Sequence, residues 1–251
     1  ALSATPKRIY DPEGSAAMEA YFNDQEPYTY SFSMERAITE GILCNYDYHP
    51  HIVQLTPHEL EEYVAISKKL SRLYRAEGGF ADEDLAQMLL MKRKRIIHKA
   101  VNKLQITRSI LQDRFEKEGS LSYTFIYVPE GRTSEPSDDD TGEEGAENIR
   151  IIHQYTREIG RIHQSILVNQ FVSGMSDRDQ VLNQFRDGKI QVIASMKCLD
   201  EGVDIPRAEH AIFCSSTGNP RQFIQRRGRI LRKHPDKLKA IIHDLIVVPD
   251  L

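Results

Sequence analysis

The feature that most constrains the fold is the regular alternation of short apolar runs with amphipathic stretches after residue 119. Apolar runs typical of buried strands occur at 122–128, 165–172, 190–195, 210–216 and 239–248. Stretches with helical periodicity separate several of them, at 148–163, 176–188 and 219–232. Parallel strands need long crossover connections, which helices supply, and such sheets are covered on both faces. The sequence therefore predicts an α/β fold with a parallel sheet.

The region before residue 119 has a different pattern. Residues 57–118 carry helical periodicity, and the first helix has a strong start, with Thr56 as N-cap, Pro57 at the first position and Glu59 at the third. We expect residues 80–118 to form a nearly continuous helical run. Residues 1–56 are irregular, with a helix centred in 29–43 and a strand at 51–56. The chain thus divides into three regions, 1–56, 57–118 and 119–251.

Two stretches concentrate positive charge in a chain whose formal net charge is -4. The first, residues 92–114, fits either a solvated helix exterior or contacts to phosphates. The second is the helix from Pro220, which Asn219 is expected to cap, as Ser176 is expected to cap the helix at 176–188. On a helical wheel two opposite arcs appear there. One holds Gln225, Arg226, Arg229 and Arg232, and the other holds Phe223, Ile224, Ile230 and Leu231, with Arg227 among the apolar residues.

Several classes of protein are disfavoured by composition. No run of apolar residues reaches the ~18–20 residues of a membrane helix. The three cysteines are far apart and odd in number, which indicates reduced thiols and a cytoplasmic protein. Neither the cysteines nor the acidic stretch 132–148 has the spacing of a metal site. We expect Asp82-Glu83 to be a charge pair at a helix N-terminus, and the acidic stretch to be a solvated loop.

A second candidate site follows the strand that ends at Ser195. Ligands of parallel α/β sheets bind beyond the carboxyl ends of strands. Ser195, Lys197, Gly202 and Asp204 lie in this position, although a plain connecting loop would show the same composition.

Five stretches, in order, resemble motifs of the DEAD/DEAH-like superfamily 2 helicases and translocases. "LSATP" at 2–6 is similar to motif III, "TFIYVPEG" at 124–131 to motif IV, and "FVSGMSDRDQVLNQF" at 171–185 to the stretch that follows motif IV. "ASMKCLDEGVDIP" at 194–206 resembles motif V, and "QRRGRILR" at 225–232 resembles motif VI. The resemblance implies a second RecA-like domain at 119–251, with 1–56 as the tail of the first domain and a connector. Residues 57–118 resemble a helical insertion or bridge of bacterial relatives associated with restriction or phage defence.

The resemblance also implies roles for individual residues. Arg229 and Arg232 match arginine fingers that reach the γ-phosphate of ATP. Gln225, Arg226, Gly202 and Asp204 match positions beside the nucleotide, with Arg226 helping to hold motif VI in place. Ser195, Lys197, Ser173 and Gly174 match contacts to nucleic acid, and Ser3, Ala4 and Thr5 match the link between hydrolysis and grip.

The chain contains no G-x-x-x-x-G-K-[ST] loop. Such a loop cradles nucleotide phosphates and presents a Mg²⁺ ligand. ATP and Mg²⁺ are therefore expected to be held mainly by a first RecA-like domain before Ala1, and this chain alone is expected to be inactive. We predict the C-terminal motor portion of an ATP-dependent DNA helicase or translocase, with DNA as partner and RNA as an open alternative. The other interpretation is a non-catalytic RecA-like module that binds nucleic acid or protein.

Overall fold

The computed structural model describes residues 11–75, 78–129, 142–172, 174–196, 205, 207–215 and 220–249. Its centre is a six-stranded sheet with the order β1-β6-β5-β2-β4-β3, and every neighbouring pair is parallel. The strands are β1 (Asn45–Val53), β2 (Thr124–Tyr127), β3 (Val168–Phe171), β4 (Val192–Ser195), β5 (His210–Phe213) and β6 (Lys239–Val247). This confirms the predicted RecA-like α/β fold.

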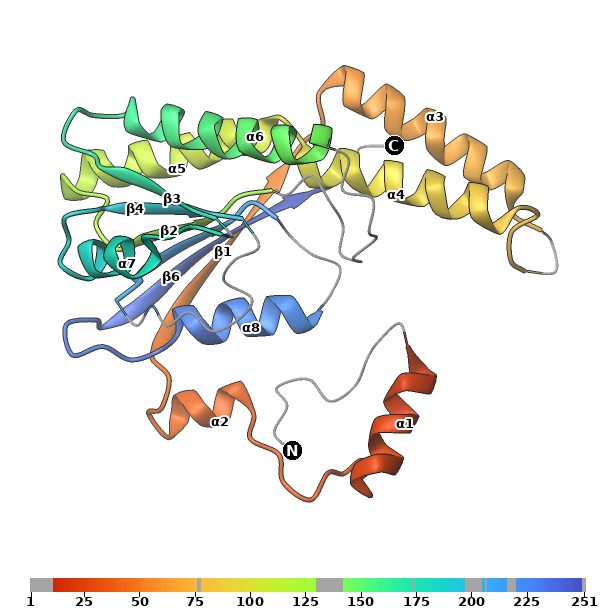
Figure 1. Ribbon diagram of the computed structural model, residues 1–251, viewed down its shortest axis with the longest axis horizontal. Coiled ribbons are helices and arrows are strands. Elements are labelled where there is room, and N and C mark those ends of the chain that lie inside the picture. The colour runs from red at the N-terminus through yellow and green to blue at the C-terminus, as the bar shows by residue number, and fades with distance from the viewer. Residues whose placement is uncertain are drawn as a thin grey trace.

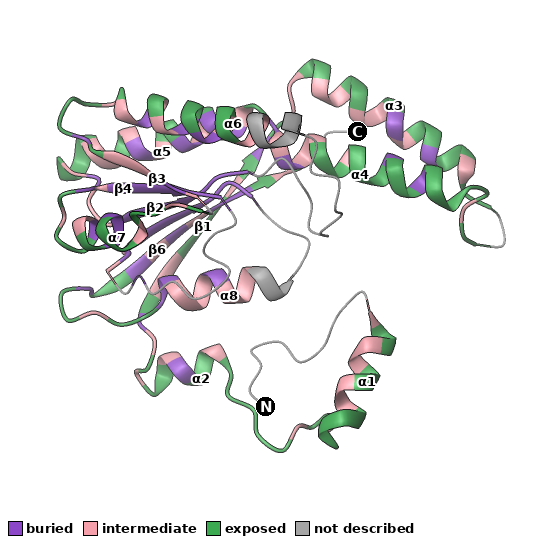
Figure 2. Ribbon diagram, viewed as in Figure 1, coloured by how far each residue is buried: buried purple, intermediate pink, exposed green. Residues whose placement is uncertain are grey.

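Helices cover both faces of this sheet (Figure 1). Two early helices lie on the side of the sheet where α8 lies, α1 (Pro12–Phe22) and α2 (Met34–Thr39). The others are α3 (Pro57–Leu73), α4 (Glu83–Lys99), α5 (Asn102–Glu118), α6 (Gly142–Gly160), α7 (Arg178–Arg186) and α8 (Pro220–Ile230). The sheet packs against α7 and α8 in one core, around Phe185 and Ile230, and against α5 and α6 in another, around Leu111 and Ile159. Figure 2 shows the central strands as the most buried elements.

Strand β1 begins earlier than the sequence predicted and lies in the same sheet as the strands after residue 119. It runs in register with β6 over nine residue pairs, from Asn45↔Lys239 to Val53↔Val247. Pro50 lies within it, which an edge strand tolerates because one row of its backbone groups has no strand partner. The strand therefore separates from the rest of 1–56, with which the sequence analysis grouped it.

Helices α3 and α4 form an antiparallel arm that extends beyond the sheet (Figure 1). The arm has its own small core of Ile66, Leu70, Ala86 and Leu89. Its first helix begins with the predicted capping box, in which the Glu59 amide donates to Thr56 Oγ1 at 3.4 Å and the Thr56 amide donates to Glu59 Oε2 at 2.8 Å. Asp82 caps α4 by accepting from the Leu85 amide at 2.9 Å, and Glu83 lies in the first turn, as the charge-pair interpretation expected.

Two local expectations were wrong. The helical run after residue 80 is broken at Ala100, where the backbone leaves the helical region with ψ 122°. Contacts from distant residues stabilise this break, since the Val101 amide donates to Glu59 Oε1 at 2.9 Å and the Asn102 side chain donates to the Gln54 carbonyl at 2.8 Å. Helix α7 starts after Asp177 rather than Ser176, without a side-chain cap. Asn219 lies outside the described residues.

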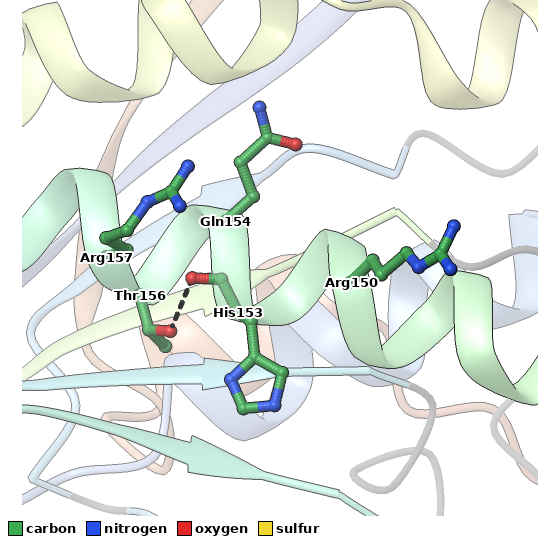
Figure 3. Close-up of a pocket in the computed structure, with 5 residues that line it drawn as sticks. All are labelled: Arg150, His153, Gln154, Thr156 and Arg157. Atoms are coloured by element: carbon green, nitrogen blue, oxygen red, sulfur yellow. Dashed lines mark hydrogen bonds between the residues drawn. The ribbon is translucent and has the colours of Figure 1, made fainter.

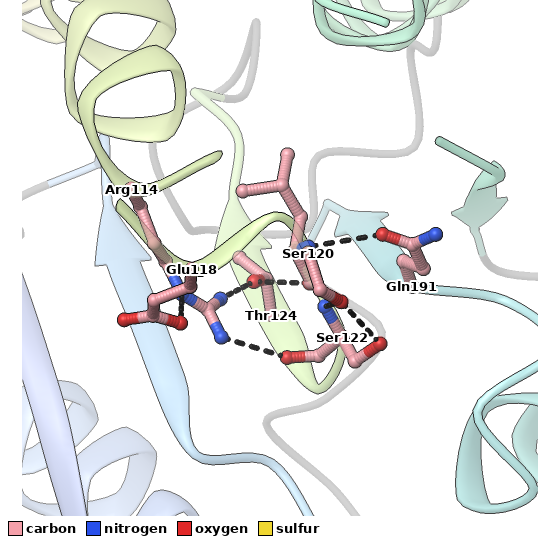
Figure 4. Close-up of polar contacts among 7 residues, drawn as sticks. Arg114, Glu118, Ser120, Ser122, Thr124 and Gln191 are labelled. Atoms are coloured by element: carbon pink, nitrogen blue, oxygen red, sulfur yellow. Dashed lines mark hydrogen bonds and ion pairs between the residues drawn. The ribbon is translucent and has the colours of Figure 1, made fainter. Parts of the chain in front are cut away.

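A polar cluster fixes the start of β2 against the end of α5 (Figure 4). The Arg114 guanidinium donates to Thr124 Oγ1 at 2.5 Å and to the Ser122 carbonyl at 3.1 Å, and pairs with Glu118 at 2.8 Å. The Leu121 amide donates to Gln191 Oε1 at 3.0 Å, which joins the same turn to the start of β4. Arg114 belongs to the basic stretch 92–114, and its role here is structural.

Candidate functional site at helix α8

Helix α8 and the two residues after it carry Gln225, Arg226, Arg229 and Arg232, and contacts from the sheet, from Lys237 and from the segment before β1 hold the end of this helix in place. Ile230 and Leu231 are fully buried in the core beneath it. The buried Lys237 ammonium donates to the carbonyl of Ile230, the last residue of the helix, and to that of Arg232 just beyond it. The Cys44 amide donates to the Leu231 carbonyl at 2.8 Å, and Leu43 forms a backbone bridge with Arg232. The residues just before β1 therefore fix the end of α8.

A groove of about 850 Å³ lies between α8 and α2. Gln225, Arg229 and Arg232 line one side of it, as the wheel predicted. Arg229 is half-buried and Arg232 is exposed, so neither guanidinium is enclosed in the core. The opposite side, formed by α2 and the residues before it, is mixed: Met34 and Ile38 line it together with Ser31, Ser33 and Glu35. The two arginines expected to act together thus lie on one surface.

Arg226 differs from the wheel prediction, which placed it on the same arc as Arg229. It is only 4% exposed, and its guanidinium donates to the Ser215 carbonyl at 3.0 Å and to the Ser215 hydroxyl at 2.9 Å. The same group lies 5.1 Å from the ring centroid of Tyr127. Arg226 therefore anchors the α8 helix to the ends of β2 and β5. Such a position fits a residue that holds motif VI in place better than one that contacts a ligand.

Arg227, which the wheel left among apolar residues, also lines the groove. Its guanidinium lies 4.8 Å from the ring centroid of Tyr46 and 5.0 Å from that of Phe223, and donates a hydrogen bond to the Tyr46 hydroxyl. Aromatic faces attract a guanidinium, which explains how a charged side chain occupies an apolar arc. Sequence reasoning missed Tyr46. The alternation of Tyr46 and Tyr48 before the apolar residues of β1 is the signal that would have found it.

The carboxyl ends of β3 and β4 form the second candidate site. Ser195 ends β4 in register with Tyr127 and Phe171, and is 2% exposed. Its hydroxyl has no hydrogen-bond partner among the described residues. Gly174 is exposed after β3, with a φ of 81° that favours glycine. The remaining candidates lie outside the described residues: Ser3, Ala4, Thr5, Ser173, Lys197, Gly202 and Asp204.

Polar groups lie near this edge of the sheet, and Asp244, Lys103 and His98 among them are buried. Tyr48 donates to Asp244 Oδ2 at 2.7 Å, and burial followed by this bond raises the pKa of Tyr48 to about 12. Lys103 is 1% exposed and donates to the His98 carbonyl at 2.9 Å. Burial lowers the pKa of Lys103 to about 8 and that of His98 to about 3. The start of α5 thus brings a desolvated ammonium to the sheet.

The basic stretch 92–114 is divided by the fold. Several of its side chains are engaged within the chain, among them Arg93 on Tyr63, Lys99 with Glu147, Lys103 in the core, Arg108 with Glu158, and Arg114 with Glu118. Lys92, Lys94 and Arg95 of α4 are exposed. The solvated and the phosphate-binding interpretations therefore concern mainly the exposed side chains of α4.

Across the described ranges, no group of His, Cys, Asp and Glu side chains has the arrangement of a metal site. Within the same ranges, no helix combines the length and the apolar character needed to cross a membrane.

Comparison with known proteins agrees with the geometry of α8 and the sheet. Residues 143–234 match the model of the helicase conserved C-terminal domain, a range that includes strands β3, β4 and β5 and all of motif VI. A DNA 3'-5' translocase, XPB2 of Sulfurisphaera tokodaii, is 28% identical over 237 residues, which cover 92% of this chain. Residues 143–234 are thus similar to a helicase C-terminal domain. The chain spans 49% of the length of that translocase.

Solved structures show the same fold at low identity. A fragment assigned as the HsdR subunit of a type I restriction enzyme from Vibrio vulnificus YJ016 has a TM-score of 0.56 at 17% identity, covering 97% of this chain and 38% of that one. The C-terminal domain of the SWI2/SNF2 ATPase of Sulfolobus solfataricus has a TM-score of 0.52 at 15% identity, covering 81% and 80%. The chain therefore shares its fold with these two proteins.

Proposed function

We propose that this chain is the C-terminal half of an ATP-dependent DNA translocase or helicase, in which Arg229 and Arg232 act on ATP held by a first RecA-like domain. The observation that carries the proposal is that both arginines line one open groove on α8. Helices α1 and α2 lie on this same side of the sheet (Figure 1). A domain that precedes α1 in the chain would then be positioned to face the groove.

Phosphoryl transfer depends on positioning and on stabilising charge at the γ-phosphate, and an arginine finger contributes roughly 10³–10⁵ in rate. The two guanidinium groups supply this charge, Gln225 lies beside them, and Arg226 holds the helix in place. ATP and Mg²⁺ would bind mainly to the first domain. Asp204 and Gly202 are proposed to approach the nucleotide from motif V.

Nucleic acid would bind along the carboxyl edge of the sheet, where Ser195 and Gly174 lie. We assign Ser173 and Lys197 to the same contact, and Ser3, Ala4 and Thr5 to its coupling with hydrolysis. The proposal includes a helical insertion at 57–118 and a second domain at 119–251 that strand β1 completes. DNA is the proposed substrate, because the relative that covers most of the chain is a DNA translocase.

The proposal is tested in the intact protein that contains this domain. We expect Arg229→Ala and Arg232→Ala each to reduce DNA-stimulated ATP hydrolysis by roughly 10³-fold or more. Arg186→Ala on α7, an exposed arginine that does not line the groove, is the matched control and should keep normal turnover. Near-normal hydrolysis by either groove variant would contradict the assignment. A wild-type protein that binds DNA without hydrolysing ATP would support the non-catalytic module instead.

A further inference from the structure

The outer surface of α6 carries a row of arginines that the proposed motor site does not use. Arg150, Gln154, Arg157 and Arg161 follow one another at intervals of three to four residues, and all four side chains are exposed. At 3.6 residues per turn, this spacing places them on one stripe along α6, and the stripe continues to Arg161, the first residue after the helix. Figure 3 shows Arg150, Gln154 and Arg157 extending from α6, while His153 is directed toward the strands.

Helix α5 adds Arg108 beside this stripe, and one carboxylate lies among the arginines. Glu158 pairs with Arg161 at 2.7 Å, with Arg157 at 3.6 Å and with Arg108 at 3.7 Å. Three arginines share one acid, and Arg150 adds a fourth positive charge. This group of Arg108, Arg150, Arg157 and Arg161 with Gln154, here named the arginine face, is strongly positive in a chain of formal net charge -4.

A hollow of about 650 Å³ lies along the side of the arginine face that is nearer to β3. Arg150, Gln154 and Arg157 line it together with His153 and Thr156. The last two are held by Gln170 of β3, whose amide nitrogen lies 2.8 Å from His153 Nδ1 and 3.0 Å from Thr156 Oγ1. The hollow therefore has a polar side fixed to the sheet. The arginines that line the hollow are largely exposed, and the Arg157 side chain is 62% exposed.

The chemistry of this surface selects its ligand. A guanidinium group meets phosphate oxygens with two parallel hydrogen bonds, and all four charges here are arginines. A protein partner would need a buried apolar or aromatic anchor. Among the described residues, no large apolar side chain between Arg150 and Arg161 is exposed. Single strands are gripped by stacked aromatic rings, and such rings are also missing from the exposed side chains of this described segment.

We propose that the arginine face binds the phosphate backbone of duplex DNA. The stripe from Arg150 to Arg161 extends about 16 Å along the helix axis, a length over which duplex DNA carries roughly ten backbone charges. Helix α6 covers the face of the sheet opposite α8, so a duplex bound there leaves the α8 groove accessible. The choice of nucleic acid as partner rests on the proposed function, whereas the site itself does not use the motor residues.

The experiment measures binding of a fluorescein-labelled duplex of mixed sequence to the intact protein, without nucleotide, by fluorescence anisotropy across a range of salt concentrations. The test variant is Arg150→Gln with Arg157→Gln. The matched control is Arg186→Gln with Lys189→Gln, which removes two exposed charges at α7 on the other face. Each lost phosphate contact lowers the slope of log K against log salt by about 0.9. We expect the magnitude of this slope to fall by nearly two in the test variant and to keep the wild-type value in the control.

An unchanged slope in the test variant, or an equal loss in both pairs, would overturn the proposal. Arg150→Lys with Arg157→Lys keeps both charges and should retain most of the wild-type slope. A greater loss of affinity for single-stranded DNA than for the duplex would also overturn it. A loss confined to binding of polyglutamate would overturn it too, because that result would indicate an acidic protein partner. Thermal unfolding midpoints check that the variants fold. Since ATP is omitted, the outcome is independent of what Arg229→Ala shows.

Discussion

The Arg227 guanidinium of α8 donates a hydrogen bond to the Tyr46 hydroxyl of β1, although 181 positions separate the two residues in the chain. The same guanidinium lies between the rings of Tyr46 and Phe223. The helix that carries Arg229 is thereby tied to the edge strand that follows α2. The orientation of the groove arginines depends on both segments.

Removal of this hydroxyl tests the tie with little other disturbance. Tyr46→Phe keeps the ring under Arg227 and removes the acceptor, so we expect a loss of about 1 kcal/mol in the free energy of unfolding. In the intact protein, we expect a several-fold lower kcat for ATP hydrolysis with little change in KM for ATP, because the arginines lose orientation while ATP binds mainly elsewhere. Tyr21→Phe, at a residue 82% exposed, is the control. Unchanged stability and kcat would show that the contact has no such role.

Arg226 is expected to be more sensitive to substitution than the exposed arginines. Arg226→Ala leaves the carbonyl and hydroxyl of Ser215 without their buried donor, and the expected loss is about 2–4 kcal/mol of unfolding free energy. Arg226→Lys restores the charge but lacks the planar fork, so only part of the stability should return. Urea unfolding measures both, and a cost below that of Arg186→Ala would be inconsistent with the anchoring role.

Stability is expected to fall as the pH drops below neutrality. Burial, with neighbouring positive groups, lowers the pKa of His243 to about 4 and those of His210 and His98 to about 3. The unfolded chain binds these protons near pH 6.5, so the stability is present above that pH and is lost as the pH falls toward 4. At pH 5 the loss should be about 1–2 kcal/mol for each histidine.

Urea unfolding midpoints measured from pH 7.5 to 5 check this dependence. His243→Gln should flatten the profile, because one of the depressed groups is gone. His58, an exposed histidine at the start of α3, provides the control substitution His58→Gln. Profiles of equal steepness in the His243 variant and the wild type would refute the assignment.

The buried charge of Lys103 is expected to lower the free energy of unfolding of the wild-type protein. Its ammonium is 1% exposed and burial lowers its pKa to about 8. Lys103→Met keeps the apolar stem and removes the buried charge, so we expect about 1–3 kcal/mol of added stability at pH 7. Because the folded pKa lies below the unfolded one, wild-type stability should rise between pH 8 and pH 10.5, and the variant should lack this rise. A destabilised Met variant would mean that the ammonium is needed.

The strands and helices after residue 119 could be predicted because their apolar periodicity reflects burial in one sheet. The arginines at 229 and 232 could be placed on one surface for the same reason. The extent of β1 could not be predicted, because Pro50 and several polar residues interrupt its pattern and its partner strand β6 lies near the other end of the chain. The break at Ala100 depends on Glu59 and Gln54.

The positions of Arg226 and Arg227 show where helical geometry is insufficient. A wheel gives the angle of each side chain but not what lies opposite it. Tyr127 and Ser215 attract Arg226 inward, and Tyr46 accommodates Arg227 in an otherwise apolar surrounding. The residues outside the described ranges, Gly202 and Asp204 among them, remain predictions.

The pairing of β1 with β6 sets the limits for producing this domain in isolation. A recombinant fragment that starts at residue 119, or at the first residue of the family match, would leave the whole length of β6 as an open sheet edge. Bare edges of this kind recruit other chains and promote aggregation. Such a fragment would also lack the ring that holds Arg227 and the backbone donor at Cys44. A recombinant fragment for expression of the domain should therefore begin upstream of Leu43.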